Sequence, residues 1–330
     1  MMARTEDCLP LNRRYVLKRG TALAAGTLLA GTGFSAWAQQ RPPIIDMHMH
    51  ARMNNTLLPN GSALPRPCIP LPCAGVPAAF TGEGAILRGT LDAMERYNIV
   101  LGVVSGTPAD VDHWVRAAPD RFLPSTGIFE GILTGSTLRD IAELRREFTS
   151  GRFKAMGEIG TQYRGLPPND ARFEPFFALA EELDLPTWVH TLGLGAPVPD
   201  FRSSAGHPLL LEDIVIRHPR LRLYFENAGY PFLDEAIALM TQYGQVYADL
   251  STITWLIPQS AFDRHVRALV EAGLATRLMY GSDVSEFPEA IGLGIERIQS
   301  AAYLTAEQKR DILYNNAARF LRLDATGRPR

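Results

Sequence analysis

Cysteine is scarce in this chain of 330 residues, which contains three. Cys8 lies near the start, and Cys68 and Cys73 lie together in a proline-rich stretch at 67–73. Zinc sites built on cysteine need more thiols than this pair supplies, because structural zinc prefers four ligands and the chain has no further cysteine to add. In an oxidising compartment two cysteines this close can bridge. We therefore expect a disulfide between Cys68 and Cys73 rather than a thiolate metal site.

A strong imbalance of charge is also absent, because 33 basic and 35 acidic residues give a net charge of −2. The sequence has no basic patch or stripe, which is the usual electrostatic signature of a nucleic-acid interface. It also has no glycine-rich phosphate loop after its first expected strand, which argues against an open dinucleotide-binding sheet. The first absence removes nucleic acid from the expected partners, and the second removes an open dinucleotide-binding sheet from the expected folds.

The sequence lacks an apolar run that would span a bilayer comfortably. The apolar stretch at 21–34 is too short and too rich in glycine to cross ~30 Å of hydrocarbon. It follows Arg13-Arg14 and precedes Ala36-Trp37-Ala38, an A-x-A cleavage pattern. These features are typical of a twin-arginine export signal. We expect residues 1–38 to be removed and the mature chain, without a stable membrane span, to reach the periplasm through the twin-arginine export machinery.

Residues 39–330 alternate between short apolar runs and amphipathic stretches. The run at 99–104, for example, is continuously apolar, which suits a strand buried on both faces of a parallel sheet. Strands are expected at 44–50, 99–104, 122–128, 154–159, 186–190, 221–226, 246–250 and 277–281. Helices are expected at 85–98, 108–118, 138–150, 173–184, 209–218, 232–243, 259–272, 288–300, 305–314 and 316–321.

This alternation predicts an α/β fold with a parallel sheet. Eight strand–helix units in about 290 residues favour a single (β/α)8 barrel domain over residues 39–330. A long loop at 51–84, rich in proline, asparagine and glycine, separates the first strand from the first helix. Loops of that length inside a compact domain are usually functional.

Two histidines lie at the end of the first expected strand. His48 and His50 are two residues apart, so on a strand both side chains point to the same side and can approach one metal ion. Further potential ligands end later strands, namely Glu158, His190 and Asp283. In a (β/α)8 barrel the carboxyl ends of the strands meet on one rim, which carries the catalytic groups of barrel enzymes. The sequence therefore predicts a metal site at this rim.

Four short motifs carry a resemblance to a known family: Asp46-Met47-His48-Met49-His50, Gly157-Glu158-Ile159-Gly160, Gly281-Ser282-Asp283 and Ile312-Leu313-Tyr314-Asn315-Asn316-Ala317. With them, essentially all of residues 39–330 resembles the amidohydrolase superfamily, in the branch of amidohydrolase-related proteins that includes zinc-dependent decarboxylases. The resemblance implies metal ligands on strands one, four, five, six and eight. Carried over by position, the ligands are His48, His50, Glu158, His190 and Asp283.

The sixth strand departs from the family pattern. The family usually has a histidine there, whereas this chain reads Phe225-Glu226-Asn227-Ala228-Gly229-Tyr230-Pro231 and has Asn227 at that position. An amide oxygen is a poor substitute for imidazole on zinc. We therefore expect one Zn²⁺ ion per chain, with another divalent metal as an alternative, and expect Asn227 to orient substrate or water.

The expected reaction is metal-assisted hydrolysis of an ester, a lactone or an amide of a small molecule. Bound zinc lowers the pKa of its water from 15.7 toward about 7. Asp283 is expected to accept the proton of this water as general base and to deliver it later to the leaving group. His190 is expected to help hold the carbonyl oxygen as negative charge develops.

Two alternatives stay open beside hydrolysis. Decarboxylation of an aromatic or unsaturated acid needs a cation to hold the carboxylate, and Arg52 or Arg202 could serve. A catalytically silent metal- or ligand-binding barrel is favoured by the missing strand-six histidine and opposed by the five retained ligands.

Three further histidines lie outside the predicted metal site. His207 lies in the irregular stretch at 191–208 on the active rim, where loops contact substrates, so it is a candidate for substrate binding with Arg52. His113 and His265 lie on expected helices and are expected to face solvent. Both a monomer and a homo-oligomer are compatible with this sequence.

Overall fold

The computed structural model describes residues 41–53, 84–131, 137–196, 198–324 and 327. The expected export signal at 1–38 lies outside these residues, as do Cys68, Cys73 and most of the loop at 51–84. Export and the disulfide therefore stay predictions. Within the described ranges, no helix combines the length and the apolar character needed to cross a membrane.

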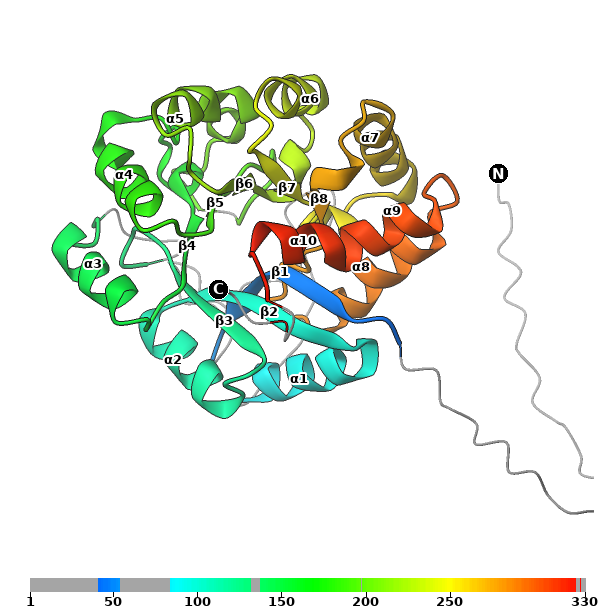
Figure 1. The fold of residues 1–330 in the computed structure, drawn as a ribbon, viewed down its shortest axis with the longest axis horizontal. Coiled ribbons are helices and arrows are strands. Elements are labelled where there is room, and N and C mark those ends of the chain that lie inside the picture. Colours follow the sequence, from blue (N-terminus) through cyan, green and yellow to red (C-terminus); the bar gives the residue numbers. More distant parts are fainter. Residues whose placement is uncertain (1–40, 54–83, 132–136, 197, 325–326, 328–330) are drawn as a thin grey trace, which may run out of the picture. The chain divides into compact units, whose positions relative to one another are not determined.

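Eight parallel strands form a nearly closed barrel (Figure 1). Each strand pairs with the next one in the chain, so all of them begin at one end of the barrel and finish at the other. The predicted (β/α)8 fold is thereby confirmed. The strands are β1 (Ile44–Ala51), β2 (Ile99–Gly106), β3 (Phe122–Thr126), β4 (Ala155–Ile159), β5 (Thr187–Val189), β6 (Leu223–Phe225), β7 (Tyr247–Asp249) and β8 (Leu278–Met279).

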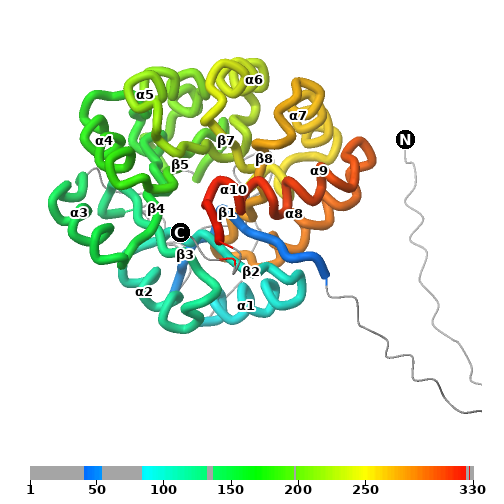
Figure 2. Tube along the Cα trace, viewed as in Figure 1, coloured from blue at the N-terminus to red at the C-terminus, as the bar shows by residue number. Residues whose placement is uncertain are grey.

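Helices follow the strands and cover the outside of the barrel (Figure 2). They begin where local chemistry favours it: Thr107 caps α2 ahead of Pro108 by accepting from the Asp110 backbone N–H, and Asp140 caps α3 in the same way. The helices are α1 (Ala85–Tyr97), α2 (Pro108–Ala117), α3 (Ile141–Thr149), α4 (Glu174–Glu182), α5 (Glu212–Arg217), α6 (Leu233–Gln242), α7 (Gln259–Glu271), α8 (Glu289–Ser300), α9 (Ala306–Arg310) and α10 (Asn316–Phe320). A π-helical turn at Asp311–Asn315 joins α9 to α10, where the sequence pattern predicts two separate helices.

The barrel closes between its first and last strands through the segments that carry candidate ligands. The Met47 N–H donates to Tyr280 O at 2.9 Å, and the Asp283 N–H donates to His48 O at 2.8 Å. The His50 N–H donates to the Val284 carbonyl at 2.7 Å. The carboxylate of Asp46 adds to this seam, because its Oδ1 accepts from the Ser282 N–H at 2.9 Å.

The inside of the barrel is apolar at the end where the strands begin. Trp188 of β5 and Tyr224 of β6 stack there with ring centroids 5.5 Å apart, and the Tyr224 hydroxyl donates to Met47 O at 2.7 Å. Helix α10 closes this end, with Phe320 packed edge-on against Tyr224. Because aromatic and apolar side chains fill one end of the barrel, the polar side chains gather at the other.

Candidate active site

Six ionisable side chains converge where the strands finish. The structure brings all five predicted ligands together and adds a sixth side chain. They are His48 and His50 of β1, Glu158 of β4, His190 directly after β5, Glu226 directly after β6 and Asp283 after β8.

The first donor group consists of His48, His50 and Glu158, whose nearest ligand atoms all lie within 4.8 Å of one another. The Nε2 atoms of His48 and His50 are 3.2 Å apart, and Glu158 Oε2 lies 3.4 Å from His50 Nε2. Asp283 completes this arrangement, with Oδ1 3.0 Å from His50 Nε2 and 3.5 Å from His48 Nε2. Two imidazole nitrogens and two carboxylates therefore face one point.

The second donor group consists of Glu158, His190 and Glu226, again within 4.8 Å. His190 Nδ1 lies between the two carboxylates, 2.8 Å from Glu158 Oε1 and 3.0 Å from Glu226 Oε2. Glu226 Oε1 is also 3.8 Å from His48 Nε2. Glu158 is thus shared by both groups.

Glu226 is the site residue that the sequence analysis missed. Strand six contributes its carboxylate to the cluster, whereas the adjacent Asn227 was expected to hold this position. A signal for it existed, because a carboxylate directly after the buried run Leu223–Phe225 occupies the strand-end position that singled out the other ligands. Asn227 has a left-handed φ of 58°, and its backbone N–H donates to Asp249 Oδ1 at 2.9 Å. Its buried side-chain amide makes no hydrogen bond with any described residue.

Burial and mutual proximity set the protonation of these groups. Burial disfavours a charged imidazole, yet Glu226 and Asp283 outweigh it and raise the pKa of His48 well above its usual value. Hydrogen bonds to Glu158 and Glu226 likewise overcome burial and raise the pKa of His190 to about 10. Burial and the neighbouring charge of Glu158 raise the pKa of Glu226.

Two carboxylates in the cluster are instead held ionised. Burial works against their charge, but His190 lowers the pKa of Glu158, and His48 and His50 lower the pKa of Asp283 well below its usual range. The Thr252 hydroxyl also donates to Asp283 Oδ2. Asp283 is the more accessible of the two, because its side chain is 21% exposed and that of Glu158 is 6% exposed.

The chemistry of this donor set fits a divalent cation. Mixed imidazole and carboxylate ligands suit zinc and related transition metals. Buried polar atoms without partners are rare, because each costs free energy. In this cluster Glu226 Oε1, which lies 3.8 Å from His48 Nε2, makes no hydrogen bond with any described residue. The close approach of two Nε2 atoms is also accounted for by a shared cation.

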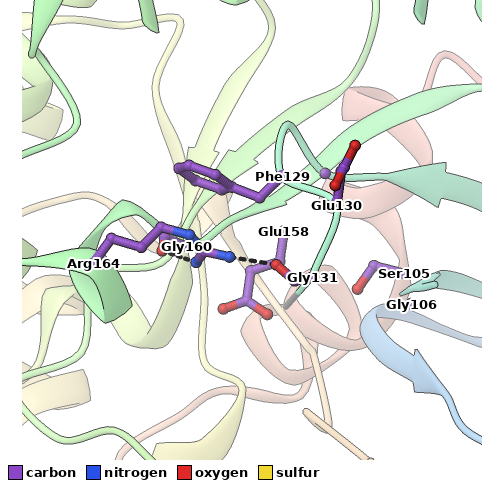
Figure 3. Close-up of a pocket in the computed structure, with 9 residues that line it drawn as sticks. Ser105, Gly106, Phe129, Glu130, Gly131, Glu158, Gly160 and Arg164 are labelled. Carbon is purple, nitrogen blue, oxygen red and sulfur yellow. Dashed lines mark hydrogen bonds between the residues drawn. The ribbon is translucent and has the colours of Figure 1, made fainter. Parts of the chain in front are cut away.

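A small hollow opens beside the cluster, and Glu158 forms part of its wall (Figure 3). Ser105 lines it too, and its hydroxyl is 3.2 Å from His50 Nδ1. Arg164 lies across the hollow with its guanidinium 3.7 Å from the centre of the Phe129 ring, and it donates to Gly160 O at 2.8 Å and to Gly131 O. Arg164 is the one cation among the described residues that line this hollow.

The predicted substrate-binding residues lie in different surroundings. Arg52 follows β1, with Nε 4.0 Å from Glu286 Oε1. Arg202 donates to the carbonyls of Pro199 and Phe201 and is largely exposed. His207 lies against Phe232, and its Nε2 is 3.5 Å from Glu235 Oε1.

The two histidines expected to face solvent differ from each other. His113 on α2 is half-buried. For His265 on α7 the prediction is wrong, because its side chain is buried and its Nε2 is 2.9 Å from Ala228 O. The reason is helical spacing, since Ala261, Phe262, His265 and Val266 share one buried face of α7.

Comparison with known proteins gives one family and several similar structures. A family model described as amidohydrolase matches residues 45–323. The protein fluG of Emericella nidulans is 27% identical over 155 residues, which is 42% of this chain but only 18% of that protein. The chain thus spans less than a fifth of that relative.

Two solved structures share the barrel. A probable 2-pyrone-4,6-dicarboxylic acid hydrolase from Acinetobacter baumannii is 14% identical with a TM-score of 0.57, over 84% of this chain and 98% of that one. The 5-carboxyvanillate decarboxylase of Novosphingobium aromaticivorans, complexed with manganese, is 16% identical with a TM-score of 0.50, over 71% and 79%. At these identities the likeness shows the fold alone.

Proposed function

We propose that this chain, which belongs to the amidohydrolase family, is a metal-dependent hydrolase of an ester, lactone or amide of a small molecule. One observation carries the proposal. Two imidazole Nε2 atoms 3.2 Å apart share their surroundings with Asp283, a carboxylate that solvent can reach. A cation-binding pair and an accessible base are the two components that hydrolysis by activated water requires.

The residues of the cluster have different roles in this reaction. His48, His50, Asp283 and Glu158 would hold the ion, which polarises carbonyl groups and lowers the pKa of water when bound. Asp283 accepts the proton of the attacking water and returns it to the leaving group. The contact from Thr252 to Oδ2 orients this carboxylate and leaves Oδ1 directed at His50.

His190 supports the reaction from the other side of the cluster. Its Nδ1–H lies between the two glutamates, which fixes the plane of the ring. Its Nε2 has no partner among the described residues and can donate to the carbonyl oxygen as negative charge develops. The Tyr163 ring also packs against His190, with ring centroids 4.7 Å apart and the planes tilted by 48°.

We propose one tightly held ion per chain, with Zn²⁺ favoured and Mn²⁺ as the alternative. The first donor group with Asp283 supplies four ligands, the number that zinc prefers. In the second group the Nδ1–H of His190 already serves both Glu158 and Glu226, so these carboxylates are compensated without a second cation.

Decarboxylation of a carboxylic acid is the second candidate, and Arg164 favours it. A planar guanidinium binds carboxylates through paired N–H groups. Arg164 lies in the hollow that Glu158 also lines, where its guanidinium donates to the Gly160 and Gly131 carbonyls, whereas Arg202 is exposed and directed at surface carbonyls. The manganese-containing decarboxylase among the similar structures is consistent with this candidate.

One experiment separates hydrolase, decarboxylase and silent binding protein. Metal-depleted protein is reloaded with Zn²⁺ or Mn²⁺ and offered neutral esters, lactones and amides beside aromatic and unsaturated carboxylic acids. Proton release reports hydrolysis of esters and lactones, amine release reports hydrolysis of amides, and released CO₂ reports decarboxylation. We expect metal-dependent release of protons from at least one ester or lactone, or of amine from at least one amide. Release of CO₂ from the acids, without hydrolysis of any ester, lactone or amide, would support decarboxylation instead of hydrolysis. Tight metal binding without any turnover would favour a catalytically silent barrel.

A further inference from the structure

A buried hydroxyl and a buried carboxylate lie behind His48, on the side of its ring away from the donor groups. Ser251 Oγ is 2.8 Å from His48 Nδ1, and the Ser251 hydroxyl contacts Asp249 Oδ1. Asp249 Oδ2 lies 3.5 Å from the same Nδ1. All three side chains are fully buried, so no exchange with bulk water competes with these contacts.

The direction of these hydrogen bonds follows from counting protons. Asp249 Oδ1 accepts from the backbone N–H groups of Asn227 and Ser251, so this oxygen acts as an acceptor, and a serine hydroxyl has one proton to donate. Asp249 Oδ1 therefore receives the Ser251 proton, and Ser251 Oγ can take part in the contact with His48 only as an acceptor. The proton between them must belong to His48 Nδ1. This leaves Nε2 as the nitrogen that faces His50 and Glu158, as a metal ligand must.

The same carboxylate also holds the turn after strand six. Asp249 Oδ1 accepts from the backbone N–H of Asn227 at 2.9 Å and of Ser251 at 3.2 Å. Asn227 and Ala228 both have left-handed φ values, 58° and 44°, which non-glycine residues adopt only when their surroundings fix them. Glu226 immediately precedes this turn. Asp249 thereby orients a ligand of the first donor group and the backbone beside a ligand of the second.

We propose that Ser251 and Asp249 are positioning residues that fix His48 as an Nδ1–H donor and so direct its Nε2 at the ion. The inference rests on the metal site of the proposed function but not on which reaction that site performs. Partners of this kind, which hold a ligand by its second nitrogen, typically contribute 10–100-fold to metal affinity.

His50 provides the internal comparison. Its Nδ1 is 3.2 Å from Ser105 Oγ, but Ser105 has no carboxylate partner among the described residues. A serine bound to a carboxylate is a better-defined acceptor than a serine alone, because its own proton is already committed. Ser251→Ala should therefore reduce metal affinity more than Ser105→Ala, although both serines are buried and each contacts one histidine.

The test reads the ring protons of His48 directly. Protein labelled with ¹⁵N-histidine is studied by long-range ¹H–¹⁵N NMR, metal-free and loaded with Zn²⁺, and the signals of His48 are assigned by their loss in His48→Gln. We expect a slowly exchanging proton on Nδ1 in both states and the zinc-induced shift on Nε2. A His48 ring protonated on Nε2 alone in the wild-type chain would overturn the inference.

The variants add a second readout. Titration with Zn²⁺ should give a dissociation constant about 10–100-fold weaker for Ser251→Ala and for Asp249→Asn, with a smaller change for Ser105→Ala. In Asp249→Asn an amide N–H can face His48 Nδ1, so this variant should also move the ring proton to Nε2. Equal affinities in the two serine variants would contradict the inference. If instead the wild-type chain takes up no ion, the proposed function fails, whereas the Nδ1 proton of the metal-free protein still decides the inference.

Discussion

Replacing Gly281 by alanine perturbs the metal site by shape alone, without removing any ligand or charge. A Cβ at this position would lie 2.9 Å from Ser251 Oγ, 3.0 Å from His48 Cβ and 3.4 Å from Asp249 Oδ2. Ser251 and His48 must each retreat by about 0.4–0.5 Å to restore ordinary contact at 3.4 Å. This movement pushes on both ends of the hydrogen bond from His48 to Ser251.

Two effects of this substitution are separable. Overpacking of a filled interior lowers the free energy of unfolding by about 1–3 kcal/mol. Alanine also restricts the unfolded chain more than glycine does, which offsets roughly 0.4–1 kcal/mol of this loss. The displaced His48 should also bind the ion about tenfold less tightly. At an ion concentration 100 times the wild-type dissociation constant, loading stabilises the wild type by about 2.7 kcal/mol and a tenfold weaker variant by about 1.4 kcal/mol.

The assay is denaturant unfolding with and without Zn²⁺ for wild type, Gly281→Ala and Gly244→Ala. Gly244 is the matched control, because a Cβ there meets nothing within 4 Å and its φ is not left-handed. The control should keep the full stabilisation by zinc. If Gly281→Ala also keeps it, the spacing behind His48 does not govern metal binding, and the reasoning fails even if the variant is less stable without metal.

Three other outcomes follow from the site and its support. His48→Ala should leave less than one equivalent of metal after dialysis, and elemental analysis that still finds a full equivalent would contradict the assigned first donor group. Asp283→Asn should lower kcat by about 10²–10⁴-fold at saturating metal if Asp283 is the general base, so an unchanged kcat would exclude that role. Burial lowers the pKa of His265 below its usual 6.5, so below about pH 6.5 the unfolded chain binds a proton at this histidine that the folded chain does not bind. The metal-free wild type should therefore lose stability relative to His265→Gln as pH falls below about 6.5, and the stability difference between the two should not depend on pH above that value. A stability difference that stays constant from pH 8 to pH 5 would refute this prediction.

The sequence alone was enough to predict the site residues whose positions are determined by regular secondary structure. His48 and His50 lie two residues apart on a strand, and alternation alone places them on one side. Glu158 and His190 follow from the rule that parallel strands in a barrel finish on one rim. In each case a short, local pattern and one property of the fold fix the position.

The missed residues depend on the exact place where a strand turns. Glu226 rather than Asn227 enters the cluster because the chain becomes left-handed at 227, and that turn is held by Asp249 from the neighbouring strand. Such a contact between strands leaves no local signature in the sequence, so the position of Glu226 directly after the buried run Leu223–Phe225 was the signal that could have indicated it. Arg164 lies in a single 3-10 turn after β4, Thr161–Arg164, whose direction is set by tertiary contacts. His265 could have been found, because helical spacing with Phe262 and Leu269 places it on the buried face of α7.

The seam between β1 and β8 gives the ion a role in holding the chain together as well as in chemistry. His48 and Ser282 are 234 positions apart, yet they adjoin at this seam. β8 itself is only two residues long, and the contacts that close the barrel come from the segment just after it. A cation held jointly by His50 and Asp283 would cross-link the first strand to the segment after the last one and offset the entropy of closing the chain between these two residues into one loop. Supply of the ion during folding would then decide how firmly the barrel closes, before any substrate arrives.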